Sequence, residues 1–185
     1  VNLDQVIEET IPTLQKLQQQ GKVRYIGITG LPLNSFRYVL DKTDVDTVLS
    51  YCHYTLFDTS LVGLLPLLHK KKVGVINASP LAMGLLTERG APDWHPASEE
   101  IRKTCAEAVD FCKSKGIDIA KMALQFSHTN QEISTTIVGT ANPDNIKKNV
   151  QWIQEPIDIE LLEQVLAILE PIKDETWMSG RLENN

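Results

Sequence analysis

The sequence contains few cysteines and no long hydrophobic run. Its three cysteines are an odd number and form no Cys-x-x-Cys pair, which argues against a disulfide framework and against a zinc site. No apolar stretch approaches the roughly 18 residues of a membrane helix. Residues 1–4 also have neither the basic start nor the apolar stretch of a signal peptide. We therefore expect a cytoplasmic protein that has buried thiols, no metal site and no membrane partner.

Positive charge is also in short supply. The chain has 18 lysines and arginines against 24 acidic residues, a formal net charge of −6. A nucleic-acid partner would reward a dense basic face, so we expect none. The Lys70-Lys71-Lys72 run is the one basic cluster, and its place at a predicted helix end favours a solvated terminus that matches the helix dipole. With 42% hydrophobic residues, the 185-residue chain can form one domain with a core.

Four apolar, β-branched segments predict buried strands. They are residues 23–29, 45–52, 73–78 and 133–138. Their apolar runs are nearly continuous, which is typical of a parallel sheet that is covered on both faces.

Helical patterns lie between and around the predicted strands. Pro12 is expected to kink or split the first of them. A loop over residues 84–97 and a tail over 174–185 have no helical period. The predicted helices are residues 4–20, 36–40, 60–72, 98–114, 118–129, 142–153 and 157–173. The alternation of strands and helices predicts an α/β fold, either an open doubly wound sheet or part of a (β/α)₈ TIM barrel, because a complete barrel needs about 250 residues.

Four segments, in this order, resemble the aldo-keto reductase family. Residues 21–29 resemble its fifth strand, 78–86 its seventh strand and following loop, 119–126 its seventh helix, and 137–143 its eighth strand and cofactor loop. Residues 49–54 and 92–98 are similar to members that oxidise sugars with NAD. The resemblance implies that residues 1–185 form the carboxyl-terminal half of such a domain, approximately strands five to eight of the barrel.

The chemistry implied by the resemblance is hydride transfer between a nicotinamide and the carbonyl or anomeric carbon of a sugar. In this family an Asp, Tyr, Lys and His set on the first four strands and their loops handles the proton. None of the histidines or tyrosines of this chain matches that set, so we assign no catalytic residue. The parent protein is expected to be an NAD-dependent aldose dehydrogenase, whereas activity of this chain alone is not expected.

The resemblance assigns most of the cofactor site. Thr29 and Ser50 match positions that hold the carboxamide, and Asn149 matches an adenine contact. Backbone amides of a loop after one strand, and of the turn before a helix, would face the pyrophosphate. The residues at those phosphate positions are Ser79, Leu81, Gly84, Gly139 and Thr140. For the first of these loops, an ordinary turn after a strand is the alternative reading.

Cofactor choice depends on two of these positions. Family members that use NADP commonly carry a cation at the places held here by Gly139 and Asn145, and both residues are uncharged. NAD is therefore expected and NADP is less favoured, with Lys147 and Lys148 as the competing cations.

Two tryptophans and a histidine are candidates for the substrate pocket. Trp94 and His95 lie in the Pro-rich loop and Trp177 lies in the tail, and barrel loops at the carboxyl ends of strands build the site. A surface loop fixed by prolines is the alternative. Trp152 and Met122 are expected in the core because they lie on apolar helix faces.

Three readings remain open from sequence. The chain belongs to an NAD-dependent sugar dehydrogenase, to an enzyme of the same fold that acts on a different sugar, or to a truncated, non-catalytic dinucleotide-binding or interaction protein. A half-barrel would leave strand edges at residues 23–29 and 133–138 and an uncovered inner face. We therefore expect a small-molecule sugar substrate, together with self-association or pairing with a missing amino-terminal half.

Overall fold

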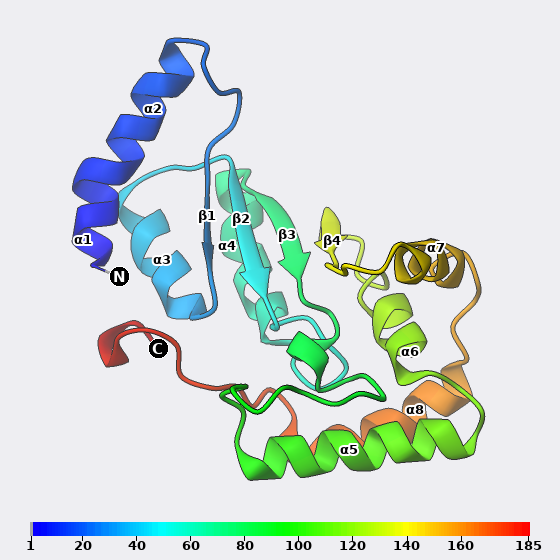
Figure 1. The fold of residues 1–185 in the computed structure, drawn as a ribbon. Helices are drawn as coiled ribbons and strands as arrows, with labels where there is room; N and C mark the ends of the chain where they lie inside the picture. The colour runs from blue at the N-terminus through cyan, green and yellow to red at the C-terminus, as the bar shows by residue number, and fades with distance from the viewer. Residues whose placement is uncertain (1) are drawn as a thin grey trace.

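A computed structural model describes residues 2–185, and its centre is a parallel sheet of four strands (Figure 1). The strands are β1 (Gly27–Gly30), β2 (Thr47–Tyr51), β3 (Gly74–Ala78) and β4 (Thr135–Ile137). Their order in the sheet is β1-β2-β3-β4, and every neighbouring pair is parallel. A doubly wound sheet reverses its strand order at a switch point, whereas a barrel keeps chain order. The sheet is therefore part of a (β/α)₈ barrel, as one of the two readings predicts.

Short helices connect and flank the strands. The amino-terminal helical run comprises α1 (Leu3–Gln5), a π-helical turn at Val6–Thr10, and α2 (Ile11–Gln19), whose first turn contains Pro12. A widened turn directly before the proline agrees with the predicted distortion, because proline lacks the N–H group that a regular helix needs. The others are α3 (Leu33–Lys42), α4 (Leu65–Lys71), α5 (Glu99–Ser114), α6 (Ile119–Phe126), α7 (Pro143–Trp152) and α8 (Ile159–Leu169).

Polar side chains begin several of these helices where the sequence predicted them. Ser98, Asp118 and Asn142 each accept a hydrogen bond from a backbone N–H of the first turn of α5, α6 and α7. Helix α3 is longer than predicted, and neither Asn34 nor Ser35, the polar residues expected to cap it, lies at its start. It starts after Pro32, because the ring fixes φ at −65° and the chain enters the helix directly from there.

The residues of each strand alternate between two very different faces. Val48 and Val75 point to α2, α3 and α4 and belong to a cluster that we call the helix-face cluster. Phe36, Leu40 and Leu68 pack there and are at most 1% exposed. Burial of these side chains holds the three helices against one side of the sheet.

The opposite, inner face of the sheet is open. Thr29 and Thr135 are exposed on it, and Ile137 is 48% exposed. The prediction that both faces of the outer strands are buried is therefore wrong for β1 and β4, because no layer packs on the inner face within residues 2–185. The strand starts were also predicted too early. The Asp46 carboxylate accepts a hydrogen bond from the backbone N–H of Ile26 at 2.8 Å. This N–H is therefore not part of the sheet, and β1 begins only at Gly27.

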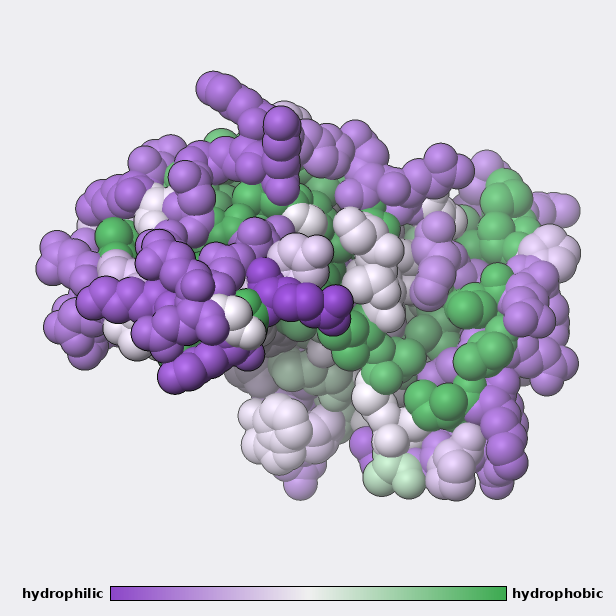
Figure 2. Space-filling view, turned by 90° about the horizontal axis from the view of Figure 1, so that it is seen from above, coloured by the Kyte–Doolittle hydropathy of each residue, from purple (hydrophilic) through white to green (hydrophobic). Residues whose placement is uncertain are grey.

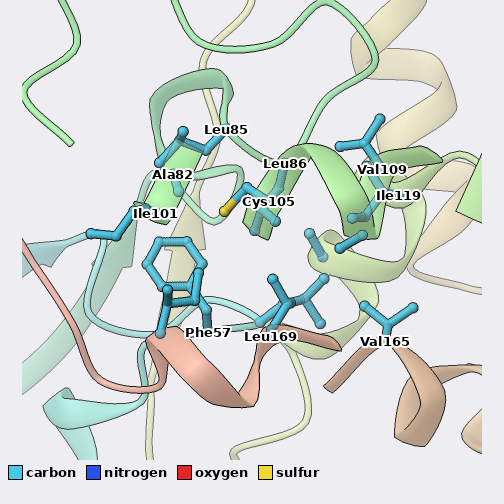
Figure 3. Packing of buried hydrophobic residues seen from close by; sticks show 14 of the residues in the cluster. Phe57, Ala82, Leu85, Leu86, Ile101, Cys105, Val109, Ile119, Val165 and Leu169 are labelled. Atoms are coloured by element: carbon cyan, nitrogen blue, oxygen red, sulfur yellow. The ribbon is translucent and has the colours of Figure 1, made fainter. Parts of the chain in front are cut away.

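A second apolar cluster, the end cluster, lies beyond the carboxyl ends of the strands. Helices α5 and α8 run side by side there (Figure 1), and Figure 3 shows side chains from α5, α8 and the loop after β3 that converge on one interior. Cys52, Cys105 and Cys112 are buried free thiols of this cluster, which confirms their expected role as small hydrophobes. Burial raises the pKa of Cys52 and of Cys105 to about 12, so both are neutral thiols.

The carboxyl-terminal tail returns to the start of the chain. It leaves α8 through a 3₁₀ turn at Glu170–Ile172 and ends at a second one, Leu182–Asn184. There the Asn34 side chain of α3 donates a hydrogen bond to the Asn185 carbonyl at 3.2 Å, which places both termini on the same side (Figure 1). No helix within residues 2–185 has the length and apolar character needed to cross a membrane.

Candidate functional site

A cavity of about 520 Å³ opens at the carboxyl ends of β3 and β4. Two segments about 60 residues apart form opposite walls: the loop after β3, and the turn that leads from β4 into α7. The predicted cofactor residues that line this cavity are Ser79, Leu81, Gly84, Gly139, Thr140, Asn145 and Asn149. The fold therefore brings together seven of the nine predicted cofactor residues, at the end of the barrel strands where active sites form.

The loop after β3 is tightly wound. Ser79, Ala82, Met83 and Gly84 all have positive φ, and that of Gly84 is 109°. The Ser79 N–H donates to the Ile137 carbonyl at 3.2 Å, which joins the loop to the last residue of β4. A β-carbon at Gly84 would lie 3.1 Å from the Gly90 carbonyl oxygen, so backbone passes close to this position. Three left-handed non-glycine residues in one loop are more strained than an ordinary turn after a strand.

The opposite wall is the amino terminus of α7. Asn142 caps this ten-residue helix by accepting from the Asp144 N–H at 2.9 Å. The Thr140 hydroxyl accepts from the Asn142 N–H and from the Asn145 side chain, which orders the turn. Unpaired N–H groups and the positive end of a helix dipole favour an anion at such a terminus.

The charges at the cavity also favour an anion. Of its two lining carboxylates, Asp118 caps α6 and Glu88 faces Lys113 at 4.0 Å. Arg89 lines the same cavity and makes no hydrogen bond or ion pair with any residue that the structure describes. Sequence reasoning missed Arg89 because it treated residues 84–97 as a connecting loop. The available signal was a cation ten residues after Ser79, in the loop already assigned to phosphate binding.

Thr29 and Ser50 do not join this cavity. Thr29 lines a second cavity of about 520 Å³ at the β1 edge, together with Gly30 and Tyr51. Ser50 is fully buried on the helix face, where it pairs in register with Asn77. Side chains alternate along a strand, so it is Tyr51, and not Ser50, that shares the inner face with Thr29. The structure thus places Thr29 and Ser50, which the resemblance assigns to one carboxamide, on opposite faces of the sheet.

Two of the three predicted pocket residues are packing residues. His95 and Trp177 are buried against each other in an edge-to-face contact with ring centroids 4.7 Å apart. Trp94 is 72% exposed, and Arg102 holds its loop by donating to the carbonyls of Pro92, His95 and Ala97. The apolar ring of Trp177 gains more from the end cluster than from a wet pocket. The His95 ring centroid also lies 6.3 Å from that of Trp94, so the fold brings the three predicted residues together, and their contact with a substrate stays a prediction.

Met122 and Trp152, both predicted to lie in the core, have different surroundings in the structure. Met122 is 2% exposed in the end cluster, which confirms its predicted place in the core. Trp152 is only half-buried and lines the cavity between the β3 and β4 loops, so its predicted place in the core is wrong. Helix α7 has no buried residue, because nothing within residues 2–185 packs on its outer side.

The sequence of this chain matches one protein family and several characterised proteins. The Aldo/keto reductase family profile matches residues 1–170. L-galactose dehydrogenase of Arabidopsis thaliana is 54% identical over 99% of this chain and 60% of its own length. D-arabinose 1-dehydrogenase of Saccharomyces cerevisiae is 29% identical over 65% of this chain and 39% of its own length. The chain thus spans about 60% of the length of the first of these relatives.

Solved structures share the architecture. The holo form of the aldo-keto reductase AKR11C1 from Bacillus halodurans superposes with a TM-score of 0.71, at 23% identity, over 97% of this chain and 58% of that one. The glycerol dehydrogenase AKR11B4 from Gluconobacter oxydans gives a TM-score of 0.62, at 18% identity, over 95% of this chain and 58% of that one. At these identities the likeness concerns the fold, and it agrees with a partial (β/α)₈ barrel.

Proposed function

This chain belongs to the aldo/keto reductase family, and from that premise we propose that its parent protein is an NAD-dependent dehydrogenase that oxidises L-galactose, or a related aldose, to its lactone. With that substrate the protein would act in ascorbate biosynthesis. The observation that carries the proposal is the cavity between the β3 and β4 loops, which gathers the predicted cofactor residues from two distant segments. The 54% identity to L-galactose dehydrogenase supports this sugar over the others.

The chain's own residues would hold the cofactor from its phosphates to its adenine. The α7 amino terminus, with Gly139 and Thr140, and the tight loop at Gly84 present backbone to an anion, and Arg89 adds an unpaired guanidinium. Asn149 lines the same cavity, and the family resemblance assigns it to the adenine. A bound nicotinamide would accept the hydride from the sugar carbon. The uncharged Asn145 and Gly139 support NAD over NADP.

The proton that leaves the sugar hydroxyl needs a base from outside this chain. His53 and His95 use both ring nitrogens in hydrogen bonds to backbone or carboxylate groups, so neither presents a free nitrogen. We place the missing group on an amino-terminal segment that pairs with the open edges of β1 and β4 and covers the inner face. The exposed inner side chains Thr29, Thr135 and Ile137 support that arrangement.

We place the reaction in the cytoplasm. Three buried free thiols within one chain support a reducing compartment, because nothing in the fold pairs them.

The test is NADH formation by the full-length natural protein with L-galactose, beside D-arabinose and L-fucose. Isothermal titration with ADP-ribose and with NAD measures the cofactor site separately. In an Asn149→Ala variant we expect weaker binding of both ligands, whereas the control Gln154→Ala, just beyond the exposed end of α7, leaves both unchanged.

Each outcome selects one reading. Turnover that is highest with L-galactose supports the proposal, and higher turnover with another aldose replaces the substrate. Dinucleotide binding without turnover of any sugar selects the non-catalytic protein. The absence of dinucleotide binding contradicts the cofactor site itself.

A further inference from the structure

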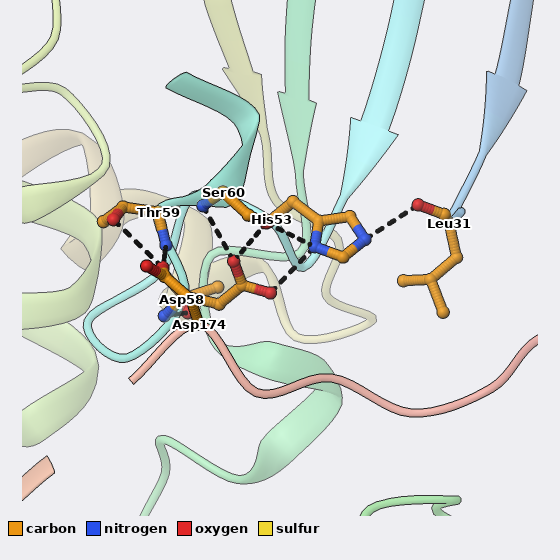
Figure 4. A network of polar contacts seen from close by, with 7 residues as sticks. Leu31, His53, Asp58, Thr59, Ser60 and Asp174 are labelled. Atoms are coloured by element: carbon orange, nitrogen blue, oxygen red, sulfur yellow. Dashed lines mark hydrogen bonds and ion pairs between the residues drawn. The ribbon is translucent and has the colours of Figure 1, made fainter. Parts of the chain in front are cut away.

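A buried histidine and a buried carboxylate meet beside the carboxyl ends of β1 and β2 (Figure 4). His53 and Asp58 are 3% and 1% exposed, and His53 Nδ1 lies 2.8 Å from Asp58 Oδ2. The other ring nitrogen, Nε2, lies 2.7 Å from the Leu31 carbonyl oxygen. Both contacts are short. Neither His53 nor Asp58 lines the cavity between the β3 and β4 loops, and neither was assigned to a site from the sequence.

The partners decide where the protons are. The Leu31 carbonyl only accepts, so His53 Nε2 must carry a hydrogen. The Ser60 hydroxyl and N–H both donate to Asp58 Oδ1, which marks this group as an acceptor. Nδ1 in turn faces Asp58 Oδ2, so both ring nitrogens lie within hydrogen-bond distance of an acceptor. His53 thus bridges Asp58, through Nδ1, and the Leu31 carbonyl, through Nε2.

This pair connects three loops. Leu31 directly follows β1 and lies one residue after Gly30, while His53 and Asp58 belong to the segment after β2. Thr59, next to Asp58, donates from its N–H and hydroxyl to Asp174 Oδ1, at 2.7 and 3.2 Å, and Asp174 begins the tail. The network therefore fixes the β1 loop relative to the β2 loop and to the start of the tail.

Two other titratable side chains belong to the same segments, those of Cys52 and Asp174. The Cys52 thiol is neutral, since burial raises its pKa to about 12. The Asp174 carboxylate accepts from the N–H and the hydroxyl of Thr59, which are both neutral donors. Among the described residues, Asp58 is thus the carboxylate that contacts the His53 ring.

We propose that His53 is a positioning residue for the nicotinamide end of the cofactor site. By donating to the Leu31 carbonyl, it holds Thr29 and Gly30 at the β1 edge, where they line a cavity with Tyr51. It does not touch the loops after β3 and β4, which would hold the phosphates. This inference rests on the proposed function, because it assumes that the β1 loop faces a nicotinamide.

Two ligands separate the two ends of the site. NAD contains the nicotinamide and ADP-ribose lacks it, so a defect confined to the β1 loop weakens only the first. In full-length His53→Gln we expect NAD affinity to fall roughly tenfold, the loss of about one good contact, and ADP-ribose affinity to change less than about twofold. The matched control is Ser60→Ala, which removes a hydroxyl that contacts both Asp58 and His53 Nδ1 and leaves the Leu31 contact in place. It should lower the melting temperature and spare both affinities.

Equal losses for both ligands in His53→Gln, or the same NAD defect in Ser60→Ala, would assign His53 a general structural role and overturn the proposal. If neither ligand binds the unmodified protein, the proposed function has failed first, and the two failures are thereby distinguished.

A measurement on the unmodified protein tests the proposal even if the His53→Gln variant does not fold. Side-chain ¹⁵N NMR follows the two His53 nitrogens, with exposed His69 as the reference ring. The His53 resonances should shift on saturation with NAD and stay unchanged with ADP-ribose. Identical responses of His53 to the two ligands would contradict the inference.

Discussion

His95 accepts a hydrogen bond through Nδ1 from the Ala97 backbone N–H at 3.1 Å, which fixes its ring as the neutral, Nε2-protonated form. Nε2 then donates to the Ala82 carbonyl at 3.2 Å and joins the loop after β3 to the Pro-rich loop. Burial lowers the pKa of His95 from its ordinary value of 6.5, and the nearby Arg102 charge acts in the same direction. Buried His95 is thus neutral.

The lowered pKa of His95 predicts that the Pro-rich loop is sensitive to acid. The unfolded chain takes up a proton on His95 as the pH falls through about 6.5, while the folded chain resists protonation. The free energy of unfolding therefore decreases as the pH falls below about 6.5, and the contribution of neutral His95 to stability is fully present above that pH. In His95→Asn, whose side-chain oxygen can still accept from Ala97, we expect a lower but flatter stability profile between pH 7.5 and 5.5. Urea unfolding at several pH values measures this, and an unchanged slope in the variant would contradict it.

Gly27 predicts a second stability effect. A β-carbon at this position would lie 2.1 Å from the Thr47 hydroxyl and 2.7 Å from the Thr47 carbonyl oxygen, on the neighbouring strand. The backbone carbonyl cannot move aside, so Gly27→Ala should cost about 1–3 kcal/mol of unfolding free energy. Gly63→Ala is the control, because a β-carbon there meets no heavy atom within 4 Å. Equal stability of the two variants in urea unfolding would show that β1 and β2 do not pair as described.

Much of this fold follows from local sequence, and the failures have physical causes. The apolar runs that predicted four parallel strands mark the correct segments, because the middle residues of β2 and β3 are buried on the helix face. The same reasoning could not detect that β1 and β4 lack cover on the inner face. Burial there depends on groups outside residues 2–185, and a β-branched run looks the same whether or not its partner is present.

The candidate site shows the same division. The resemblance placed Ser79 and Asn149 in segments 70 residues apart, and only the fold could show that they line one cavity. Ser50 was misplaced because a one-residue change of position along a strand reverses the face. The pairing of His53 with Asp58 and Leu31 had no sequence signal, since it depends on how the β1 and β2 loops meet.

Arg89 should contribute to cofactor affinity. It lines the cavity with no partner of its own, and a charge-assisted contact to a phosphate contributes about 1.5–3 kcal/mol. Arg89→Gln should therefore weaken ADP-ribose and NAD binding roughly tenfold or more, with a defect that shrinks at high salt. Arg24→Gln, exposed and outside the cavity, is the control. Isothermal titration at two salt concentrations decides the matter, and equal affinities for the two variants would remove Arg89 from the site.

The separated chain should be inactive and prone to self-association. It lacks a matching proton acceptor, and its β4 side exposes Ile137, Ile146, Val150 and Ile153, which are 41–50% exposed. Figure 2 shows hydrophobic residues open at the surface on the side of α7. Sedimentation of residues 1–185 should show oligomers, and Ile146→Lys with Val150→Lys should reduce them. A stable monomer, or sugar oxidation at the rate of the full-length protein, would contradict the partial barrel.

The choice between NAD and NADP should depend on the turn before α7. Asn145 donates to the Thr140 hydroxyl at 3.2 Å and carries no charge, and Gly139 has none either. Lys147, one competing cation, is paired with Asp144 at 3.2 Å, and neither Lys147 nor Lys148 lines the cavity. We therefore expect a higher kcat/KM for NAD in the full-length protein.

Asn145→Arg tests this directly. A guanidinium here would offer a planar pair of donors to a 2′-phosphate, worth on the order of 1.5–3 kcal/mol, so NADP efficiency should rise roughly tenfold relative to NAD. Asn145→Gln is the matched control, because it lengthens the side chain without adding charge and should leave the ratio unchanged. Equal efficiency with both cofactors in the unmodified enzyme, or no gain for NADP in the arginine variant, would show that this turn does not contact the ribose.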